Sequence, residues 1–461
     1  MGCPLSGSGT RYDRTLAAID DAIGDRRLVW FGIRGDDAAS LLEVRQFASC
    51  FSLIAPLQSG SIGQESAVAF EDLAGYRPDL DRYDVDLDLS DDAAEFKRQF
   101  LAEVSTRCVV ATYRPTVFIS SFAFSMRDTM TLAGLFKDRQ LAFEHKPWVE
   151  TSLAQRDVTT LGWTYVSDEH HARAKRLLRQ GPLVLRASRA SGGVGLVRVD
   201  TEAEIDEHWP KQADEFVAVA PYLEDATPLN LSGSVFRDGS VRLHPASVQL
   251  IGIELCTDRP FGYCGNDFGA AAALDDDVLD ALDALGRVVG KWLHEERYVG
   301  AFGVDALLHE GEIRFTEVNP RFQGSSALSA EIAAEVGEPD LFLDHLAASL
   351  GATGDSGVTL REWGLMADVR SHIVVHNTSP DPVVRQERPM IQPANRDLRI
   401  TLLPPPGLKI DPGATMFRLV LRRATTSTGF DIDQAMRETI QALAAQFEPW
   451  PQTELAVTAD G

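Results

Sequence analysis

The chain has 461 residues, of which 44% are hydrophobic and 24% are charged, and its formal net charge is −24. A chain of this length is too long for one compact core, so we expect two to four packed units. The acidity argues against nucleic-acid partners, because phosphate binding needs a basic stripe and the sequence shows none. The 5 cysteines contain no CxxC pair, so neither a disulfide framework nor a zinc site is indicated.

No apolar stretch approaches the roughly 18 residues that a membrane-spanning helix needs. The start of the chain also lacks the apolar region of a signal peptide. We therefore expect a cytoplasmic protein that has no membrane partner.

The first part of the chain, from residue 25 to about residue 135, alternates between strand-like and helical patterns. The apolar stretches "RLVWFGIRG", "TRCVVATY" and "PTVFISSF" predict strands, and "DDAAEFKRQFLAEVS" predicts a helix. Such alternation is typical of a doubly wound parallel α/β sheet. Gly32 to Gly35 lack the full GxGxxG fingerprint, so we interpret them as packing glycines rather than a dinucleotide site.

From about residue 146 the pattern changes to short strands joined by turns. "GPLVLRAS", "GLVRVD" and "EFVAVAPYL" predict three strands. Thr201 and Glu204 form a capping box that predicts the start of a helix. Asp238-Gly239 marks a hairpin turn in the strand-rich stretch that follows.

The clearest helix lies at residues 275 to 294, where apolar residues recur at helical spacing. After about residue 355 the chain becomes proline-rich and strand-like. It closes with an amphipathic helix, "DIDQAMRETIQALAAQF".

The stretch "FTEVNPRFQGSS" (315–326) places an acid, an amide and an arginine two residues apart on one predicted strand. The preceding "HEGE" is a turn signal, and a hairpin centred on Gly311 sets Asp305 opposite Glu317. Two carboxylates this close repel each other unless a cation lies between them. Mg²⁺ suits the position, because it takes oxygen ligands and is usually shared between carboxylates and substrate phosphates.

Asn319 lies on the same face as Glu317 and offers a further oxygen without adding charge. Arg321 continues this face with a guanidinium group suited to phosphate oxygens. The row is therefore predicted to hold metal-bound polyphosphate. The alternative is a solvated hairpin with incidental charges.

A glycine-rich stretch, "RASGGVG", joins two predicted strands upstream of this row. It lacks the GK[ST] ending of a P-loop. Gly192, Gly193 and Gly195 could still lie over phosphates, offer backbone N–H donors and open as a lid. Arg186 lies on the strand that leads into this stretch. Taken alone, the stretch also fits an ordinary hairpin.

With both components present, residues 140–345 resemble the ATP-grasp superfamily of carboxylate–amine ligases. Arg186 and "SGGVG" stand where the family has a basic residue, more often lysine, and a glycine-rich lid. Lys146 stands where a further lysine opens the small nucleotide-binding part. "VAVAPYL", which ends in Tyr222 and Leu223, stands at the adenine-binding hinge.

The resemblance assigns the metal to Asp305, Glu317 and Asn319, and catalysis to Arg321 and Arg186. It also implies ATP and Mg²⁺ as cofactors, with two ions that Mn²⁺ can replace, and it allows a homodimer. It implies an α/β ATP-grasp fold of four parts. We expect these at residues 1–140 (N-terminal doubly wound domain), 141–225 (small lid part), 226–354 (large metal-binding part) and 355–461 (strand-rich α+β extension).

The sequence departs from the family at three places. The hinge has an alanine and Pro221 where an acid is common, and Pro221 removes one backbone donor. The residue that holds the ribose is open between Asn230 and Glu224. Gly303 stands where some peptide-forming members have an arginine, so Arg321 would carry more of the stabilisation of the tetrahedral intermediate.

This family activates a carboxylate as an acyl phosphate, releases ADP, and lets an amine displace phosphate. We therefore expect a ligase that forms an amide or peptide bond between a small-molecule carboxylate and an amine. Two alternatives stay open: a biotin carboxylase-like enzyme that activates bicarbonate, and an ATP-binding regulatory protein without turnover.

Three further features carry open interpretations. "GYCGNDF" (262–268) predicts a loop before the long helix, with a place in the acceptor pocket as the alternative. Ser325 and Ser326 either contact substrate or cap a helix. His372 and His376 share a face if they lie on a strand, but no nearby cysteine or cluster of acids supports a zinc site.

Overall fold

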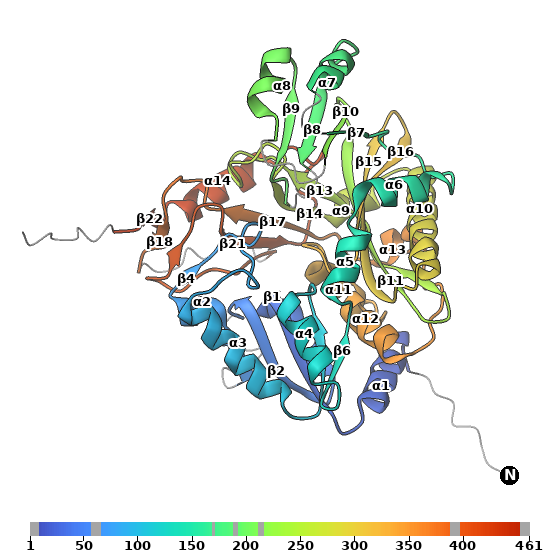
Figure 1. Cartoon of the computed structure of the whole chain (residues 1–461), viewed down its shortest axis with the longest axis vertical. Helices are drawn as coiled ribbons and strands as arrows, with labels where there is room; N and C mark the ends of the chain where they lie inside the picture. The colour runs from blue at the N-terminus through green and yellow to red at the C-terminus, as the bar shows by residue number, and fades with distance from the viewer. Residues whose placement is uncertain are drawn as a thin grey trace, which may run out of the picture.

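The computed structural model describes residues 9–56, 66–167, 171–187, 192–210, 216–387 and 397–451. Within these ranges the chain forms four β-sheets, of five, four, nine and four strands. In Figure 1 the five-stranded sheet lies at the bottom, a small sheet with two short helices at the top, and the nine-stranded sheet between them. No helix in these ranges is long and apolar enough to span a membrane.

The N-terminal sheet is parallel and has the strand order β3-β2-β1-β5-β6. Its strands are β1 (Arg27–Arg34), β2 (Phe47–Ile54), β3 (Ala67–Ala69), β5 (Cys108–Thr112) and β6 (Met130–Ala133). The helices of this region are α1 (Arg11–Ile23), the 3₁₀ helix η1 (Gly35–Glu43), α2 (Phe70–Ala74), α3 (Asp91–Val104) and α4 (Val117–Ser125). The doubly wound domain is therefore confirmed, and its strand order reverses between β1 and β5.

One strand predicted for this region is wrong. Residues 115–122 contain most of α4, which Thr116 caps by accepting the backbone N–H of Ile119 at 3.3 Å. Phe118 and Phe122 of this helix pack on Phe100 of α3. The helix is apolar on almost every side, and composition alone does not separate such a helix from a buried strand.

The small sheet is antiparallel and has the order β7-β10-β8-β9. Its strands are β7 (Thr164–Val166), β8 (Leu183–Ala187), β9 (Leu196–Val199) and β10 (Val217–Pro221), and the helices that pack on it are α7 (His171–Leu178) and α8 (Glu202–His208). The preceding helices α5 (Lys137–Phe143) and α6 (Lys146–Ala154) pack instead on the core of the nine-stranded sheet. The predicted capping box is confirmed, because Thr201 accepts the N–H of Glu204 and Glu204 accepts the N–H of Thr201.

The nine-stranded sheet has the order β16-β15-β11-β13-β14-β17-β21-β19, with β12 paired to β11. Its strands are β11 (Thr227–Val235), β12 (Val241–Leu243), β13 (Ser247–Ile251), β14 (Tyr263–Asp267), β15 (Gly300–His309), β16 (Glu312–Asn319), β17 (Ser371–His376), β19 (Leu398–Thr401) and β21 (Thr415–Leu421). The strands after residue 355 therefore continue the sheet that carries the predicted metal residues.

The loop predicted at residues 262–268 is wrong, because β14 runs through it in the middle of this sheet. Its turn-forming composition has a packing reason at Gly265. A Cβ atom on Gly265 would lie 2.1 Å from the carbonyl oxygen of His372 on the neighbouring strand, so only glycine permits this approach.

The fourth sheet has the order β22-β18-β20-β4 and joins the N-terminal region to the end of the chain. Its strands are β4 (Tyr76–Arg77), β18 (Val383–Arg385), β20 (Lys409–Ile410) and β22 (Phe447–Pro449). The other helices are α9 (Phe268–Ala272), α10 (Asp276–Glu295), α11 (Ser326–Glu335), α12 (Leu341–Leu350), α13 (Leu360–Met366) and α14 (Gln434–Ala444). The boundaries of the four expected parts stay a prediction.

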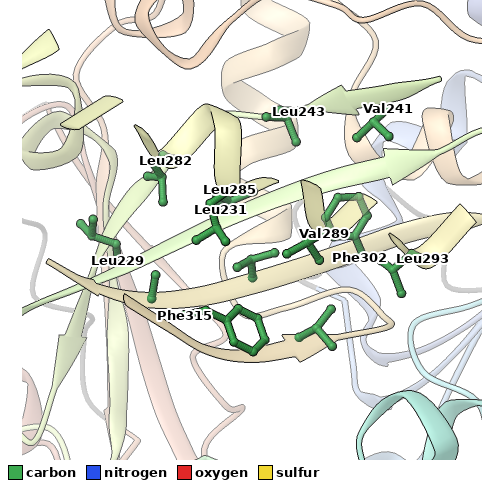
Figure 2. Close-up of a cluster of buried hydrophobic side chains, with 14 of the residues drawn as sticks. Leu229, Leu231, Val241, Leu243, Leu282, Leu285, Val289, Leu293, Phe302 and Phe315 are labelled. Carbon is green, nitrogen blue, oxygen red and sulfur yellow. The ribbon is translucent and has the colours of Figure 1, made fainter. Parts of the chain in front are cut away.

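The predicted long helix, α10, covers one face of the nine-stranded sheet. Its buried residues Leu282, Leu285 and Val289 pack on Leu231 of β11 and Phe302 of β15, as Figure 2 shows. Replacing one such leucine with alanine typically costs about 2–5 kcal/mol. This core holds β15 and its hairpin partner β16 in place.

The β15–β16 hairpin pairs Asp305 with Glu317, as predicted, although the register of the strand pairs next to the turn differs from the prediction. The turn is centred between Glu310 and Gly311, both of which have positive φ, so the pairs next to the turn are shifted by one residue from the prediction. A β-bulge at Thr316 then inserts one residue and restores the expected pairing. Without the bulge, Asp305 would face Thr316.

Candidate functional site

Asp305 is surrounded by side-chain amides from neighbouring strands. Asn230 of β11 and Gln249 of β13 donate to its Oδ1 at 2.7 and 2.8 Å. Asn319 of β16 donates to its Oδ2 at 3.0 Å. Glu317 lies opposite on the hairpin. The strands of one sheet therefore bring two acids and three amides together, and we call Asp305 and Glu317 the acidic pair.

Two cations lie beside Glu317. Lys146, the first residue of α6, has its Nζ 3.6 Å from Glu317 Oε2, and Arg186 of β8 has its Nη1 3.7 Å from the same oxygen. The Arg186 side chain is 5% exposed and stacks 4.1 Å over the ring of Trp163. Its Nε and Nη2 have no hydrogen-bond partner among the described residues. A buried guanidinium group with free donors suits an anionic ligand.

The two members of the acidic pair have opposite pKa shifts. Burial, reinforced by the charge of Glu317, raises the pKa of Asp305. Burial also acts to raise the pKa of Glu317, but Lys146, Arg186 and Arg321 outweigh it and lower this pKa. A second negative charge at Asp305 is therefore costly unless a further cation joins the pair. These residues fit a divalent cation.

The donor set matches what Mg²⁺ prefers. In the described parts of the chain, no group of three or more His, Cys, Asp or Glu side chains could hold a metal. The oxygen donors at this place are the carboxylates of Asp305 and Glu317 and the amide oxygen of Asn319. Mg²⁺ commonly takes one or two carboxylates and completes its shell with water and substrate phosphates.

The glycine-rich loop lies close to the N-terminal domain. Gly192 and Gly193 have positive φ angles of 58° and 77°. A Cβ atom on Gly192 would lie 2.3 Å from Asp81 Cγ, and one on Gly193 would lie 2.0 Å from the carbonyl oxygen of Phe261. Only glycine permits both approaches. Ser191, also part of the predicted lid, lies outside the described residues.

Two cavities meet at Glu317, Asn319 and Arg321. A cavity of ≈ 330 Å³ is lined by most of the predicted site residues. These are Arg186, Gly192, Gly193, Tyr222, Leu223, Asn230, Asp305, Glu317, Asn319 and Arg321. A second cavity of ≈ 660 Å³ shares Glu317 and Arg321 with the first and is also lined by Lys146. Gly195 lines neither cavity, and its carbonyl oxygen accepts the N–H of Ala187 at 3.4 Å.

The structure separates the two candidates for holding a ribose. Tyr222 follows β10 and lines the smaller cavity, with the guanidinium of Arg198 4.2 Å over its ring. Glu224 pairs with Arg198 at 3.0 Å, and its side chain is 62% exposed. Asn230 is buried beside Asp305 instead. We therefore place Asn230 with the acidic pair rather than at the hinge.

Sequence reasoning missed Gln323 and Gln249. Gln323 donates to Asp305 at 3.3 Å and accepts from Asn230 at 2.9 Å, so it joins the amides around this acid. It lies two residues beyond Arg321, and extending the alternating row by one step would have found it. Gln249 comes from a different strand and carries no local signal.

Arg321 and the serines after it have separate surroundings. Arg321 Nε lies 3.7 Å from Glu144 Oε1, and the side chain lines both cavities. Ser325 donates to Asn230 at 2.8 Å and makes no cap hydrogen bond to α11. Ser326 accepts the backbone N–H of Gln323 at 2.9 Å. Both serines thus support residues around Asp305.

His372 and His376 lie on β17, and both imidazole rings have hydrogen-bond partners within the protein. His372 Nε2 lies 2.9 Å from the Tyr263 hydroxyl. His376 lies 3.1 Å from the carbonyl oxygens of Tyr263 and Gly413. These contacts join the strands of the sheet.

Comparisons with solved structures identify the architecture. One similar structure is the biotin carboxylase domain dimer of Hydrogenobacter thermophilus 2-oxoglutarate carboxylase in complex with MgADP, ADP and bicarbonate. The TM-score is 0.61 and the identity 14%, with 92% of this chain and 90% of that chain covered. Another is N5-carboxyaminoimidazole ribonucleotide synthetase from Thermus thermophilus, with TM-score 0.57, identity 15%, and 92% and 99% coverage.

Biotin carboxylase from Campylobacter jejuni, in a β-γ-ATP complex, is similar with TM-score 0.54 and identity 15%, over 94% of this chain and 88% of that chain. No protein-family model matches the sequence, and no curated protein matches it. The neighbours are ATP-grasp enzymes, so the likeness confirms that this chain has the ATP-grasp fold.

Proposed function

We propose that this protein is an ATP-dependent ligase that joins a small-molecule carboxylate to an amine and releases ADP and phosphate. The observation that carries the proposal is the meeting of two cavities at Glu317, beside Lys146 and Arg186. The smaller cavity has the hinge and glycine loop expected of a nucleotide site. The larger cavity has room for an organic substrate.

The proposed reaction has two steps. An oxygen of the substrate carboxylate attacks the γ-phosphorus of ATP, and the bond from that phosphorus to ADP breaks. The amine nitrogen then attacks the acyl carbon, phosphate leaves, and the nitrogen loses a proton to water. Neither step needs a covalent bond to the protein, only positioning and neutralisation of charge.

The site residues have distinct roles in this proposal. Mg²⁺, when held by Asp305, Glu317 and Asn319, supplies positive charge to the phosphates. Arg186 and Lys146 lie where they can pair with phosphate oxygens. The loop at Gly192 and Gly193 limits the access of water, which would hydrolyse an acyl phosphate.

Arg321 lines both cavities, so it can contact a carboxylate bound between the nucleotide and the second substrate. In the proposed reaction it stabilises the charge on the tetrahedral intermediate. Its guanidinium fork suits a carboxylate with two parallel hydrogen bonds.

A second candidate is the activation of bicarbonate. It is favoured by the likeness in fold to biotin carboxylase and to N5-carboxyaminoimidazole ribonucleotide synthetase. The ≈ 660 Å³ cavity has room for an organic substrate in both cases, because carboxylation also needs an organic acceptor, so the requirement for bicarbonate decides between them. A regulatory ATP-binding protein has less use for two half-buried carboxylates beside two cations.

The test is ADP release by the purified full-length protein with ATP and Mg²⁺. Amino acids and small carboxylic acids are supplied singly and in pairs, in buffer freed of CO₂ and again with added bicarbonate. ADP release that requires an acid and an amine together supports the ligase. ADP release that requires bicarbonate supports the second candidate, and no release under any condition contradicts both.

A further inference from the structure

Two arginines of the N-terminal domain lie at the place where the parallel sheet reverses its order. Arg34 ends β1, and Arg114 follows β5 by two residues. The two strands are neighbours, and Phe31 pairs with Thr112 at this end. Strands β2 and β3 extend the sheet to one side of β1, and β6 extends it beyond β5. Open α/β sheets bind ligands in the crevice at the carboxyl ends of the strands, at such a reversal.

Both arginines line the smaller cavity together with Arg321, and Arg114 and Arg321 also line the larger cavity, which is the proposed place of the organic substrate. Arg34 Nη1 donates to Asp37 at 3.2 Å, and its guanidinium lies 5.9 Å from the centre of the Tyr113 ring. These contacts hold the guanidinium group of Arg34 in one orientation. Three guanidinium groups therefore reach one cavity from two different domains.

Arg114 is less engaged than the other two. Its Nη2 donates to the carbonyl oxygen of Tyr83 at 3.3 Å. No carboxylate of the described residues lies within ion-pair distance of it, although Asp81 lines the same cavity. Asp81 is bonded by Arg259 at 2.6 Å instead. Burial, followed by the charge of Arg321, lowers the pKa of Arg114, although the charges of Asp84 and Asp81 act to raise it.

We propose that Arg34 and Arg114 bind a second anionic group of an organic substrate, a carboxylate or a phosphate that is not itself activated. The inference rests on the proposed ligase function and narrows its substrate class. Arg321, next to the acidic pair, contacts the carboxylate that becomes activated. Arg34 and Arg114, at the end of the parallel sheet, hold the other anion. Planar guanidinium groups bind both anions well because they offer paired donors.

In the proposed site the second anionic group would fix the position of the substrate. A substrate anchored at both ends has its reacting carboxylate held at a fixed distance from the nucleotide, which lowers the entropy lost on reaching the transition state. A substrate with one anionic group has no partner for Arg114. Desolvating Arg114 without an anion also costs free energy, so the site discriminates against the analogue that lacks the second anionic group.

The experiment compares matched substrates in the ADP-release assay. Succinate is paired with butyrate and O-phosphoserine with serine, so that the carboxylate and phosphate arms are separate. We expect kcat/KM to be at least about 10-fold higher for the member of an active pair that carries the second anionic group, which corresponds to about 1.4 kcal/mol. Equal kcat/KM values within every active pair would overturn the proposal.

Variants distinguish a role of Arg34 and Arg114 in binding the anion from a structural role of these arginines. Arg114→Gln and Arg34→Gln should each raise the KM of the preferred substrate about 10-fold, leave the KM of ATP within about twofold, and leave kcat/KM of the analogue without the second anionic group unchanged. Arg176→Gln, an exposed arginine of α7, is the matched control. Arg34 also pairs with Asp37, so Arg114→Gln decides if Arg34→Gln does not fold. Equal losses with both members of a pair would show a structural role only.

The inference and the proposed function can fail separately. If no acid–amine pair releases ADP, the proposed function fails. Calorimetry with succinate and with butyrate then tests the anion site directly. Tighter binding of succinate that Arg114→Gln weakens supports the site, and equal binding of the two acids overturns it.

Discussion

Beside Asp305, the side chain of Gln323 fills the space that a side chain at Gly303 would need. A Cβ atom on Gly303 would lie 1.7 Å from Gln323 Oε1 and 2.0 Å from its Cδ, so any side chain there displaces the glutamine. Gln323 in turn bonds Asn230 and Asp305. The absence of a side chain at residue 303, noted above as a departure from the family, thus makes room for an amide at the acidic pair.

Gly303→Ala should therefore lower both stability and activity. We expect the free energy of unfolding to fall by about 1–3 kcal/mol through overpacking, and kcat/KM to fall roughly 10–100-fold, as is usual when groups that support metal ligands are lost. Urea unfolding and ADP release measure the two effects. Gly364→Ala, in α13, is the control, since its Cβ would meet ordinary contacts of 3.6 Å or more.

The double variant Gly303→Ala/Gln323→Ala distinguishes the two effects. Removing Gln323 relieves the overlap, so stability should return toward that of Gln323→Ala alone, while activity stays low. A double variant as unstable as the sum of the single ones would show that Gln323 is not the group in conflict with residue 303.

Glu317→Gln should abolish turnover. The change keeps the size of the side chain but removes the charge that lies beside Lys146 and Arg186 and faces Asp305. We expect ADP release to fall at least about 100-fold, a loss typical of a group that stabilises charge in the transition state. Glu312→Gln is the control on the same strand, where Glu312 pairs with Arg314 on the surface at 2.6 Å. ADP release close to that of the unchanged protein would contradict the assignment of the acidic pair.

The parts of the site that the sequence predicted are those in which neighbours along the chain are neighbours in space. Glu317, Asn319 and Arg321 lie on one short segment, and the turn that sets Asp305 opposite Glu317 is only a few residues away. Even here the predicted pairing of Asp305 with Glu317 depends on the bulge at Thr316, which no residue propensity indicated. The stripe of α10 was equally local and was confirmed.

The missed parts depend on which strands become neighbours. Gln249 reaches Asp305 only because β13 pairs with β11, and sequence spacing does not encode that pairing. Arg34 and Arg114 could have been found from the sequence, because Arg34 ends one predicted strand and Arg114 follows another. Finding them required the order of the sheet, since only the point of reversal turns two strand ends into one crevice.

The approach of the glycine loop to Phe261 gives a further prediction. Gly193→Ala places a Cβ atom 2.0 Å from the Phe261 carbonyl oxygen, so the loop cannot lie where it now does. We expect the KM of ATP to rise roughly 10-fold or more, since about 1.4 kcal/mol of binding free energy suffices for that change. Gly162→Ala is a matched control, because Gly162 has a similar φ of 67° and no atom within 4 Å of its Cβ position. If both variants change the KM of ATP equally, backbone strain rather than loop contact is responsible.

His345 should make the stability of the fold depend on pH. The ring is buried, its Nδ1 accepts the N–H of Ala301 at 2.9 Å, and its Nε2 lies 3.0 Å from the carbonyl oxygen of Ala133. Burial lowers its pKa to about 4, although the bond to Ala133 acts to raise it. A histidine in the unfolded chain has a pKa near 6.5, so between about pH 6.5 and pH 4 the unfolded state binds more protons. The free energy of unfolding therefore falls as the pH falls through this window.

At pH 5 this loss amounts to about 2 kcal/mol from His345 alone. His345→Gln can keep both hydrogen bonds and does not titrate, so it should lose about 2 kcal/mol less than the unchanged protein between pH 7.5 and pH 5. Urea unfolding of both proteins at the two pH values measures this difference. Buried His372, whose pKa burial also lowers, and Asp340, whose pKa burial raises to about 6, are present in both proteins, so their contributions cancel. The same pH dependence in both proteins would show that His345 becomes protonated as readily in the folded state as in the unfolded state.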